Sequence, residues 1–172
     1  MTTTLADRTE AVEYYFTYID KVPRDKDVRR VLEDQLGETV QLLSGISEDK
    51  SHYRYAPEKW SIREVVGHLS DCERLFVFRA MWFARGFDSP LPSFDQDVAI
   101  VGARSEDYSL KELVEEFRAV RGSTLHFFRN LPDEAWTRRG IASGNPFTVR
   151  ALAHIAAGHV AHHVGILRER YL

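Results

Sequence analysis

The chain has 172 residues, of which 44% are hydrophobic and 28% charged, as in an ordinary globular protein, so we expect one domain over residues 1–172. The net charge is −3 and no cluster of lysines or arginines marks a phosphate-binding surface, which argues against nucleic acid as a partner. No run approaches the roughly 18 apolar residues of a membrane span, and the N-terminus lacks the pattern of a signal peptide. We therefore expect no membrane partner and a cytoplasmic location.

The predicted elements begin with a short helix. Apolar residues at helical spacing over residues 12–19, followed by Pro23, predict a leading helix of about three turns. A second apolar pattern predicts the first long helix over residues 26–44, ended by Gly45. Residues 46–57 lack periodicity, so we interpret them as a connecting loop.

A capping box predicts the start of the second long helix. Ser61 and Glu64 have the spacing of reciprocal N-terminal caps, and the apolar stripe that follows continues to Gly86. Residues 87–108 show no sustained period, and so long a connection favours a crossover along the bundle that makes the flanking helices parallel. In its middle, Phe94–Asp97 either lies across the mouth of an active site or is a packed connector.

Another capping box predicts a long amphipathic helix over residues 109–131. We expect residues 133–144 to form a loop, and the last helix to begin near Pro146 or just after Thr148. No strand pattern is present. Together, these predicted helices indicate an all-α four-helix bundle. It has a long crossover between its second and third helices and a short extra helix at the N-terminus.

Four of the seven histidines lie in the last predicted helix. His159 and His163 fall near the middle of its apolar stripe, at the i, i+4 spacing by which two helical imidazoles bind one metal ion. His154 lies on the opposite side, where we expect it to be exposed, and His162 lies at the edge, where we expect it to be half-exposed. The alternative is that the two inward rings are core histidines satisfied by hydrogen bonds.

A third ligand must come from another helix, and His68 is the best placed. Three neutral imidazoles leave positions for water or substrate, as in catalytic metal sites. We expect zinc or nickel, with iron, cobalt or manganese as alternatives. Asp71 and Glu73 would support a ligand or act as a base, unless they are surface acids that pair with arginines. Cys72, the only cysteine, is either a fourth ligand or a small core residue.

Two stretches resemble signatures of the DinB/YfiT-like metalloprotein superfamily. Residues 60–74, WSIREVVGHLSDCER, resemble its second-helix signature, in which a tryptophan precedes the helix and Asp-x-Glu follows a histidine. Residues 158–167, GHVAHHVGIL, resemble the signature of its last helix. The likeness extends over essentially the whole chain, including the FDQD of the crossover and the closing RERY.

The resemblance implies an up-down-down-up four-helix bundle, often a homodimer. It also implies a divalent metal on three histidines that correspond to His68, His159 and His163. Characterised relatives include thiol S-transferases that act with bacillithiol and isomerases that depend on mycothiol.

We therefore expect a metal-dependent enzyme that uses a low-molecular-weight thiol against an electrophilic small-molecule substrate, because coordination to a cation deprotonates a thiol. One alternative keeps the site but uses metal-bound water for hydrolysis. A second alternative is a non-catalytic stress protein that binds a metal or a small molecule. A third is a bundle without a metal.

Overall fold

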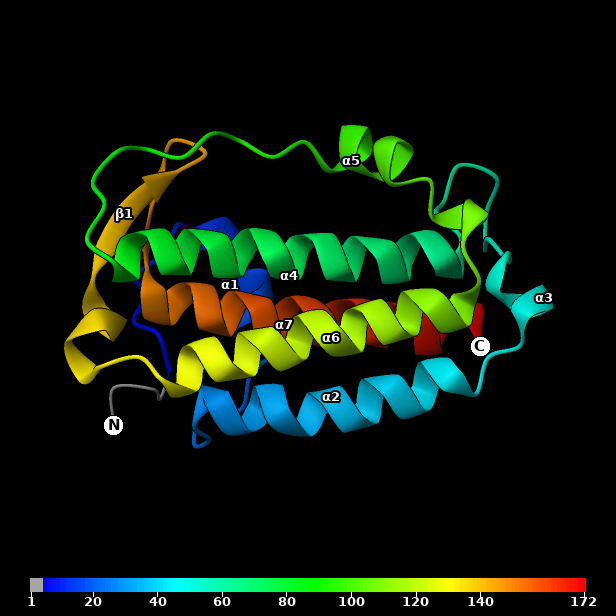
Figure 1. Ribbon diagram of the computed structural model, residues 1–172, viewed down its shortest axis with the longest axis horizontal. Coiled ribbons are helices and arrows are strands. Elements are labelled where there is room, and N and C mark those ends of the chain that lie inside the picture. Colours follow the sequence, from blue (N-terminus) through cyan, green and yellow to red (C-terminus); the bar gives the residue numbers. More distant parts are fainter. Residues whose placement is uncertain (1–4) are drawn as a thin grey trace.

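Four long helices make up the body of the protein in a computed structural model that describes residues 5–172. They are α2 (Val28–Ser44), α4 (Ile62–Ala84), α6 (Leu110–Arg129) and α7 (Val149–Ile166). α2 and α7 run in one direction and α4 and α6 in the other (Figure 1), which confirms the predicted up-down-down-up order. α4 packs against α6 and α7, and α2 packs against the same two helices, so the fold is an all-α four-helix bundle.

Capping side chains begin α4, α6 and α7 at predicted positions. Ser61 and Ser109 each accept a hydrogen bond from a backbone N–H of the first turn, and Glu64 and Glu112 accept bonds from the serine N–H groups in return. Both capping boxes are therefore confirmed. Thr148 caps α7 by its side chain alone, which accepts a hydrogen bond from the Ala151 N–H. A cap satisfies N–H groups that the first turn leaves without partners, which determines where each helix starts.

The leading helix is shorter than predicted. It consists of the 3-10 turn η1 (Glu13–Tyr15) and the single α-helical turn α1 (Phe16–Ile19). The reason lies just upstream, where the Glu10 carboxylate accepts hydrogen bonds from Thr148 and Arg150. The Glu10 carbonyl also accepts a bond of 3.0 Å from the Thr148 N–H. These bonds tie the chain before η1 to the start of α7, so it cannot continue the helix.

All three connections that we predicted to be irregular contain regular structure: residues 46–57 and 87–108 contain short helices, and residues 133–144 contain a 3-10 turn and a strand. α3 (Glu48–Ser51) lies between α2 and α4, and α5 (Gln96–Ala103) lies in the crossover that runs along α4 (Figure 1). Val98 and Val101 of α5 are 69% and 78% exposed. The apolar residues of this helix therefore do not share one buried face, so the sequence lacks the helical spacing that would have predicted it. Three further turns complete the helical elements: η2 (Ser105–Asp107), η3 (Asp133–Thr137) and the π-helical η4 (Leu167–Tyr171).

The expectation that the chain has no strands was wrong. β1 (Arg139–Ala142) and β2 (Asn145–Thr148) form an antiparallel hairpin around Ser143 and Gly144, whose φ angles are +53° and +71°. Positive φ at both central residues gives a two-residue turn the twist that its strands require. Strands of four residues are too short to show a clear alternation in the sequence. Backbone hydrogen bonds join Leu91 of the crossover to the hairpin.

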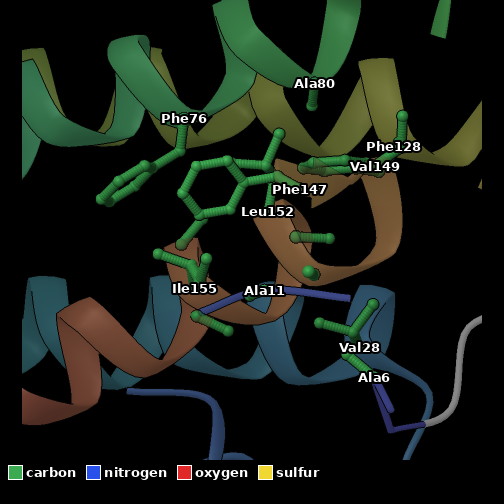
Figure 2. Packing of buried hydrophobic residues seen from close by; sticks show 14 of the residues in the cluster. Ala6, Ala11, Val28, Phe76, Ala80, Phe128, Phe147, Val149, Leu152 and Ile155 are labelled. Atoms are coloured by element: carbon green, nitrogen blue, oxygen red, sulfur yellow. The ribbon is translucent and has the colours of Figure 1, made fainter. Parts of the chain in front are cut away.

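Two clusters of buried apolar side chains fill the bundle. Figure 2 shows part of the first, to which Phe76 of α4 and Leu152 of α7 both belong. On α4 the boundary between the clusters falls between Leu69 and Cys72, one residue after His68, and on α7 it falls between Ala157 and Val160, at His159. The histidines therefore lie in a polar layer between two apolar halves. No helix within residues 5–172 is long and apolar enough to cross a membrane.

Candidate metal centre

His68 of α4 and His159 of α7 meet inside the bundle. Their Nε2 atoms are 3.0 Å apart, and the two residues are only 3% and 4% exposed. Each points inward because it lies on the face that its helix turns toward the other, and α4 and α7 are packed neighbours. The structure thus brings together two residues that are 91 positions apart in the sequence.

His163 lies beside this pair, one turn beyond His159. The centre of its ring is 4.5 Å from that of His159 and 4.9 Å from that of His68. Trp60, just before α4, stacks on His163 at 6.4 Å and also contacts the His68 ring at 4.7 Å. The Tyr171 hydroxyl donates a hydrogen bond of 2.7 Å to the Trp60 carbonyl, so the closing residues of the chain hold this tryptophan in place.

Cys72 adds a sulfur to the group. Its Sγ lies 3.6 Å from both ring nitrogens of His68. The sulfur, one nitrogen of His68 and one nitrogen of His159 all lie within 4.8 Å of one another. Two nitrogens that bind one ion at about 2.0–2.1 Å lie roughly 3.0–3.4 Å apart, and a sulfur at about 2.3 Å lies roughly 3.5 Å from such a nitrogen. The donor atoms of His68, Cys72 and His159 therefore fit one small divalent ion, whereas His163 lies beside this close group of ligand atoms and is not part of it.

The electrostatic state of the rings suits them as ligands. Burial lowers the pKa of His68 to about 4 and that of His163 to about 3, and it holds the pKa of His159 well below 6.5. All three imidazoles are therefore neutral at pH 7, the form that binds metals. Burial also raises the pKa of the Cys72 thiol to about 12, so this group is protonated until a cation lies next to it.

Two cavities adjoin the histidines. One of about 250 Å³ contains His68, Cys72 and His159 in its wall, and a second of about 300 Å³ contains His163. The first turn of α5 borders both, with Gln96 on the first and Asp97 on the second. Cavities of similar volume occur elsewhere on the molecule, but within the described residues no other one has a cluster of metal-ligand side chains in its wall.

Asp71 and Glu73 lie away from this cavity. Asp71 borders a different cavity, next to α6, and its Oδ1 is 3.5 Å from the Arg74 guanidinium. Burial raises the pKa of Asp71 above its usual value. Glu73 is 1% exposed and binds the Arg121 guanidinium at 2.7 and 3.0 Å. Both carboxylates thus have arginine partners, as the alternative interpretation proposed, but Glu73 is a buried acid and not the surface acid that it described.

The prediction for His154 was wrong, whereas the one for His162 was confirmed. His154 is fully buried, and its Nδ1 is 2.9 Å from the Arg150 carbonyl oxygen. A helical wheel assigns one side of a surface helix to solvent, but every residue of α7 from Ala151 to Val160 is buried. His162 is half-buried, with its ring edge against Tyr18.

Three further cavity residues were not assigned to the site from the sequence. Tyr18 contacts His159, with ring centres 5.4 Å apart, and Tyr15 and Arg79 also line the cavity. The tyrosines could have been found from the sequence, since several aromatic residues on a short helix indicate that it packs against the rest of the protein. Arg79 gave none, because an arginine on a long helix usually pairs with an exposed acid.

Comparison with known proteins agrees with this architecture. No curated protein sequence matches the chain significantly. Among solved structures, the chain is similar to YfiT from Bacillus subtilis, described as a probable metal-dependent hydrolase with an unusual four-helix bundle topology. The TM-score is 0.73 at 18% identity, over 86% of this chain and 90% of that one, a likeness that concerns the fold. Residues 32–167 match the sequence profile of the DinB superfamily, and the chain therefore belongs to that superfamily.

Proposed function

We propose that this protein is a divalent-metal-dependent enzyme that acts on a small molecule, with the ion held by His68, His159 and His163. The observation that carries the proposal is the 3.0 Å separation of the His68 and His159 Nε2 atoms within a buried layer. The description of YfiT as a probable metal-dependent hydrolase supports the same general class.

The hydrogen-bonding of the two buried rings argues against a purely structural role for them. In the part of the chain that the structure describes, neither His68 nor His159 bonds to a backbone carbonyl or a carboxylate. Buried polar groups in proteins normally have such partners, since leaving them unpaired costs about 1–3 kcal/mol each. His154, by contrast, has a backbone carbonyl partner, as a core histidine should.

We further propose that the cosubstrate is a low-molecular-weight thiol and that its acceptor is an electrophilic small molecule. A divalent cation bound here would stabilise the thiolate form of such a thiol at neutral pH. None of the residues that line the 250 Å³ cavity is an acid, so the chain offers no carboxylate base there. This favours a nucleophile that loses its proton upon coordination. Trp60 and Tyr18 orient the histidine rings from either side.

Hydrolysis is a second candidate, favoured by the description of YfiT. It would use the same histidines and cavity, with water in place of the thiol. The chain would then rely on the ion alone to activate the water, because Asp71 and Glu73 have other partners.

The test loads metal-stripped protein with zinc, nickel, iron, cobalt or manganese singly. Each form is offered thiols with an electrophile, and separately esters, amides and phosphate esters. We expect thiol-dependent turnover that is absent from His159→Ala. Hydrolysis without thiol would support the second candidate. Metal binding without any turnover would leave a non-catalytic metal protein, and a lack of metal binding would refute the proposal.

A further inference from the structure

Arg79 differs from the other buried arginines. Three arginines are buried in the described part of the chain: Arg63, Arg79 and Arg121. Arg121 binds Glu73 and Arg63 binds Glu48, so both of those charges are neutralised. Arg79 is 2% exposed, yet no carboxylate lies within ion-pair distance of it among the described residues. Burying a charge without a counter-ion is costly, so this guanidinium lacks the partner that its environment requires.

The neutral partners of Arg79 orient it without neutralising it. One terminal nitrogen, Nη2, donates to the Ser143 hydroxyl at 2.8 Å and to the Pro92 carbonyl at 3.2 Å. The Tyr15 hydroxyl is a further neutral partner. Nε is buried and has no hydrogen-bond partner. A guanidinium has five N–H donors, so donors remain for a ligand.

The backbone positions both of these acceptors. Ser143 occupies the hairpin turn in the left-handed region, with φ of +53°, and its hydroxyl receives the Arg79 bond there. Pro92 follows Leu91, which is hydrogen-bonded to β1. The hairpin and the crossover therefore hold the guanidinium against α4 from two sides. A fixed guanidinium is the preferred protein partner for a carboxylate.

Arg79 faces the same cavity as the candidate metal ligands. Cys72, Phe76 and Arg79 recur at helical spacing along one side of α4, and all three line the 250 Å³ cavity. Arg79 lies about 10 Å along the helix from Cys72, at 1.5 Å per residue. The lining contains this cation and no acid, so the cavity is positive even before an ion is added. Its volume is near the lower limit of about 300 Å³ for small-molecule sites.

We propose that Arg79 binds the carboxylate of a small organic anion in this cavity, with the other end of the molecule directed toward His68 and His159. The direction of the reacting end rests on the proposed function, whereas the binding of the carboxylate does not. A cavity of about 250 Å³ suits a short carboxylic acid better than a bulky one. Arg79 is thereby a substrate-binding residue that determines specificity for charge.

The test measures binding of succinate by calorimetry to metal-stripped and zinc-loaded protein. Succinamide serves as a neutral analogue and inorganic phosphate as a different anion. Arg79→Gln removes the charge, and Arg79→Lys retains it without the planar fork. Arg74→Gln is the matched control, since Arg74 is an exposed arginine on the same helix that pairs with Asp71 and Glu116.

We expect succinate to bind with and without zinc, and at least tenfold more tightly than succinamide or phosphate. Arg79→Gln should weaken succinate binding at least tenfold, Arg79→Lys should weaken it less, and Arg74→Gln should leave it unchanged. Equal binding by wild type and both Arg79 variants would overturn the proposal, as would preference for phosphate or no binding of succinate. If Arg79→Gln fails to fold, wild-type affinity in Arg79→Lys and equal binding of succinamide would each still refute it. Arg79-dependent binding by a protein that retains no zinc would support this inference while refuting the proposed metal site.

Discussion

The Glu73 carboxylate and the Arg121 guanidinium form a fully buried ion pair that joins α4 to α6. Arg121 also donates a hydrogen bond of 3.1 Å to the Leu32 carbonyl of α2, so one arginine connects three of the four long helices. Glu73 therefore has a structural role at the contact between α4 and α6 and does not line the cavity.

Replacing Glu73 should therefore affect stability first. Glu73→Gln leaves the Arg121 charge buried without its partner, and we expect the free energy of unfolding to fall by about 3–5 kcal/mol. Asp71→Asn is the control, because Asp71 is half-buried and its arginine contact is long. It should change stability by less than about 1 kcal/mol. Urea unfolding measures both. If Glu73→Gln kept its stability but lost turnover, the carboxylate would have a catalytic role instead.

Removal of either buried ligand should abolish metal binding. His68→Ala and His159→Ala each delete one of two nitrogens that lie 3.0 Å apart, so we expect metal content to fall from about one ion per chain to near zero. His126→Ala is the matched control, since His126 is exposed on α6. Elemental analysis of untagged protein measures the metal content of each variant. Full metal content in His159→Ala would place the ion elsewhere.

His163 and Cys72 should contribute unequally. The imidazole of His163 is already neutral at pH 7, whereas burial raises the pKa of Cys72 to about 12 and opposes formation of the thiolate. We expect His163→Ala to weaken zinc binding at least tenfold and Cys72→Ser to weaken it only a few-fold. The cobalt-loaded wild type should then lack an intense sulfur-to-metal absorption band. A strong band that disappears in Cys72→Ser would instead make the cysteine a ligand.

The stability of the metal-free protein should decrease in mild acid. The pKa of an unfolded histidine is about 6.5, whereas that of folded His68 is about 4, so the unfolded chain takes up protons first as the pH falls. Each such histidine should lower the free energy of unfolding by up to about 1.4 kcal/mol per pH unit below pH 6.5. Urea unfolding near pH 7 and near pH 5 measures this slope. His68→Ala should reduce it and His126→Ala should not; an identical slope in both would contradict the burial of His68.

Gly158 allows α7 to approach the leading helix. A Cβ atom at this position would lie 2.0 Å from the Tyr18 carbonyl oxygen, which is a backbone atom and cannot move aside easily. Gly158→Ala should therefore destabilise the protein by about 1–3 kcal/mol and displace Tyr18 from His159. Gly165→Ala, later in the same helix with nothing near its Cβ position, should instead stabilise by up to about 1 kcal/mol. Thermal unfolding of the Gly158→Ala and Gly165→Ala variants tests this prediction. Equal changes in the melting temperature of the two variants would argue against the close contact at Gly158.

The sequence by itself determined the long helices, their starting caps and the inward direction of His159. These features depend on neighbours within a few residues: Ser61 and Glu64 cap a helix whatever surrounds it, and apolar spacing assigns an inner face. The hairpin was missed because its short strands show no clear alternation, and because its hydrogen bonds with Leu91 join residues that are far apart in the sequence.

Only the tertiary structure decided which side chains meet. Periodicity gives the direction of a side chain from its own helix axis, but the distance between two axes depends on the packing of all four helices. This packing brings His68 to His159, buries His154 against expectation, and turns Glu73 toward Arg121. It also leaves Arg79 in the cavity without a counter-ion, which no spacing along the sequence could reveal, because its neighbours come from the crossover, the hairpin and the leading helix.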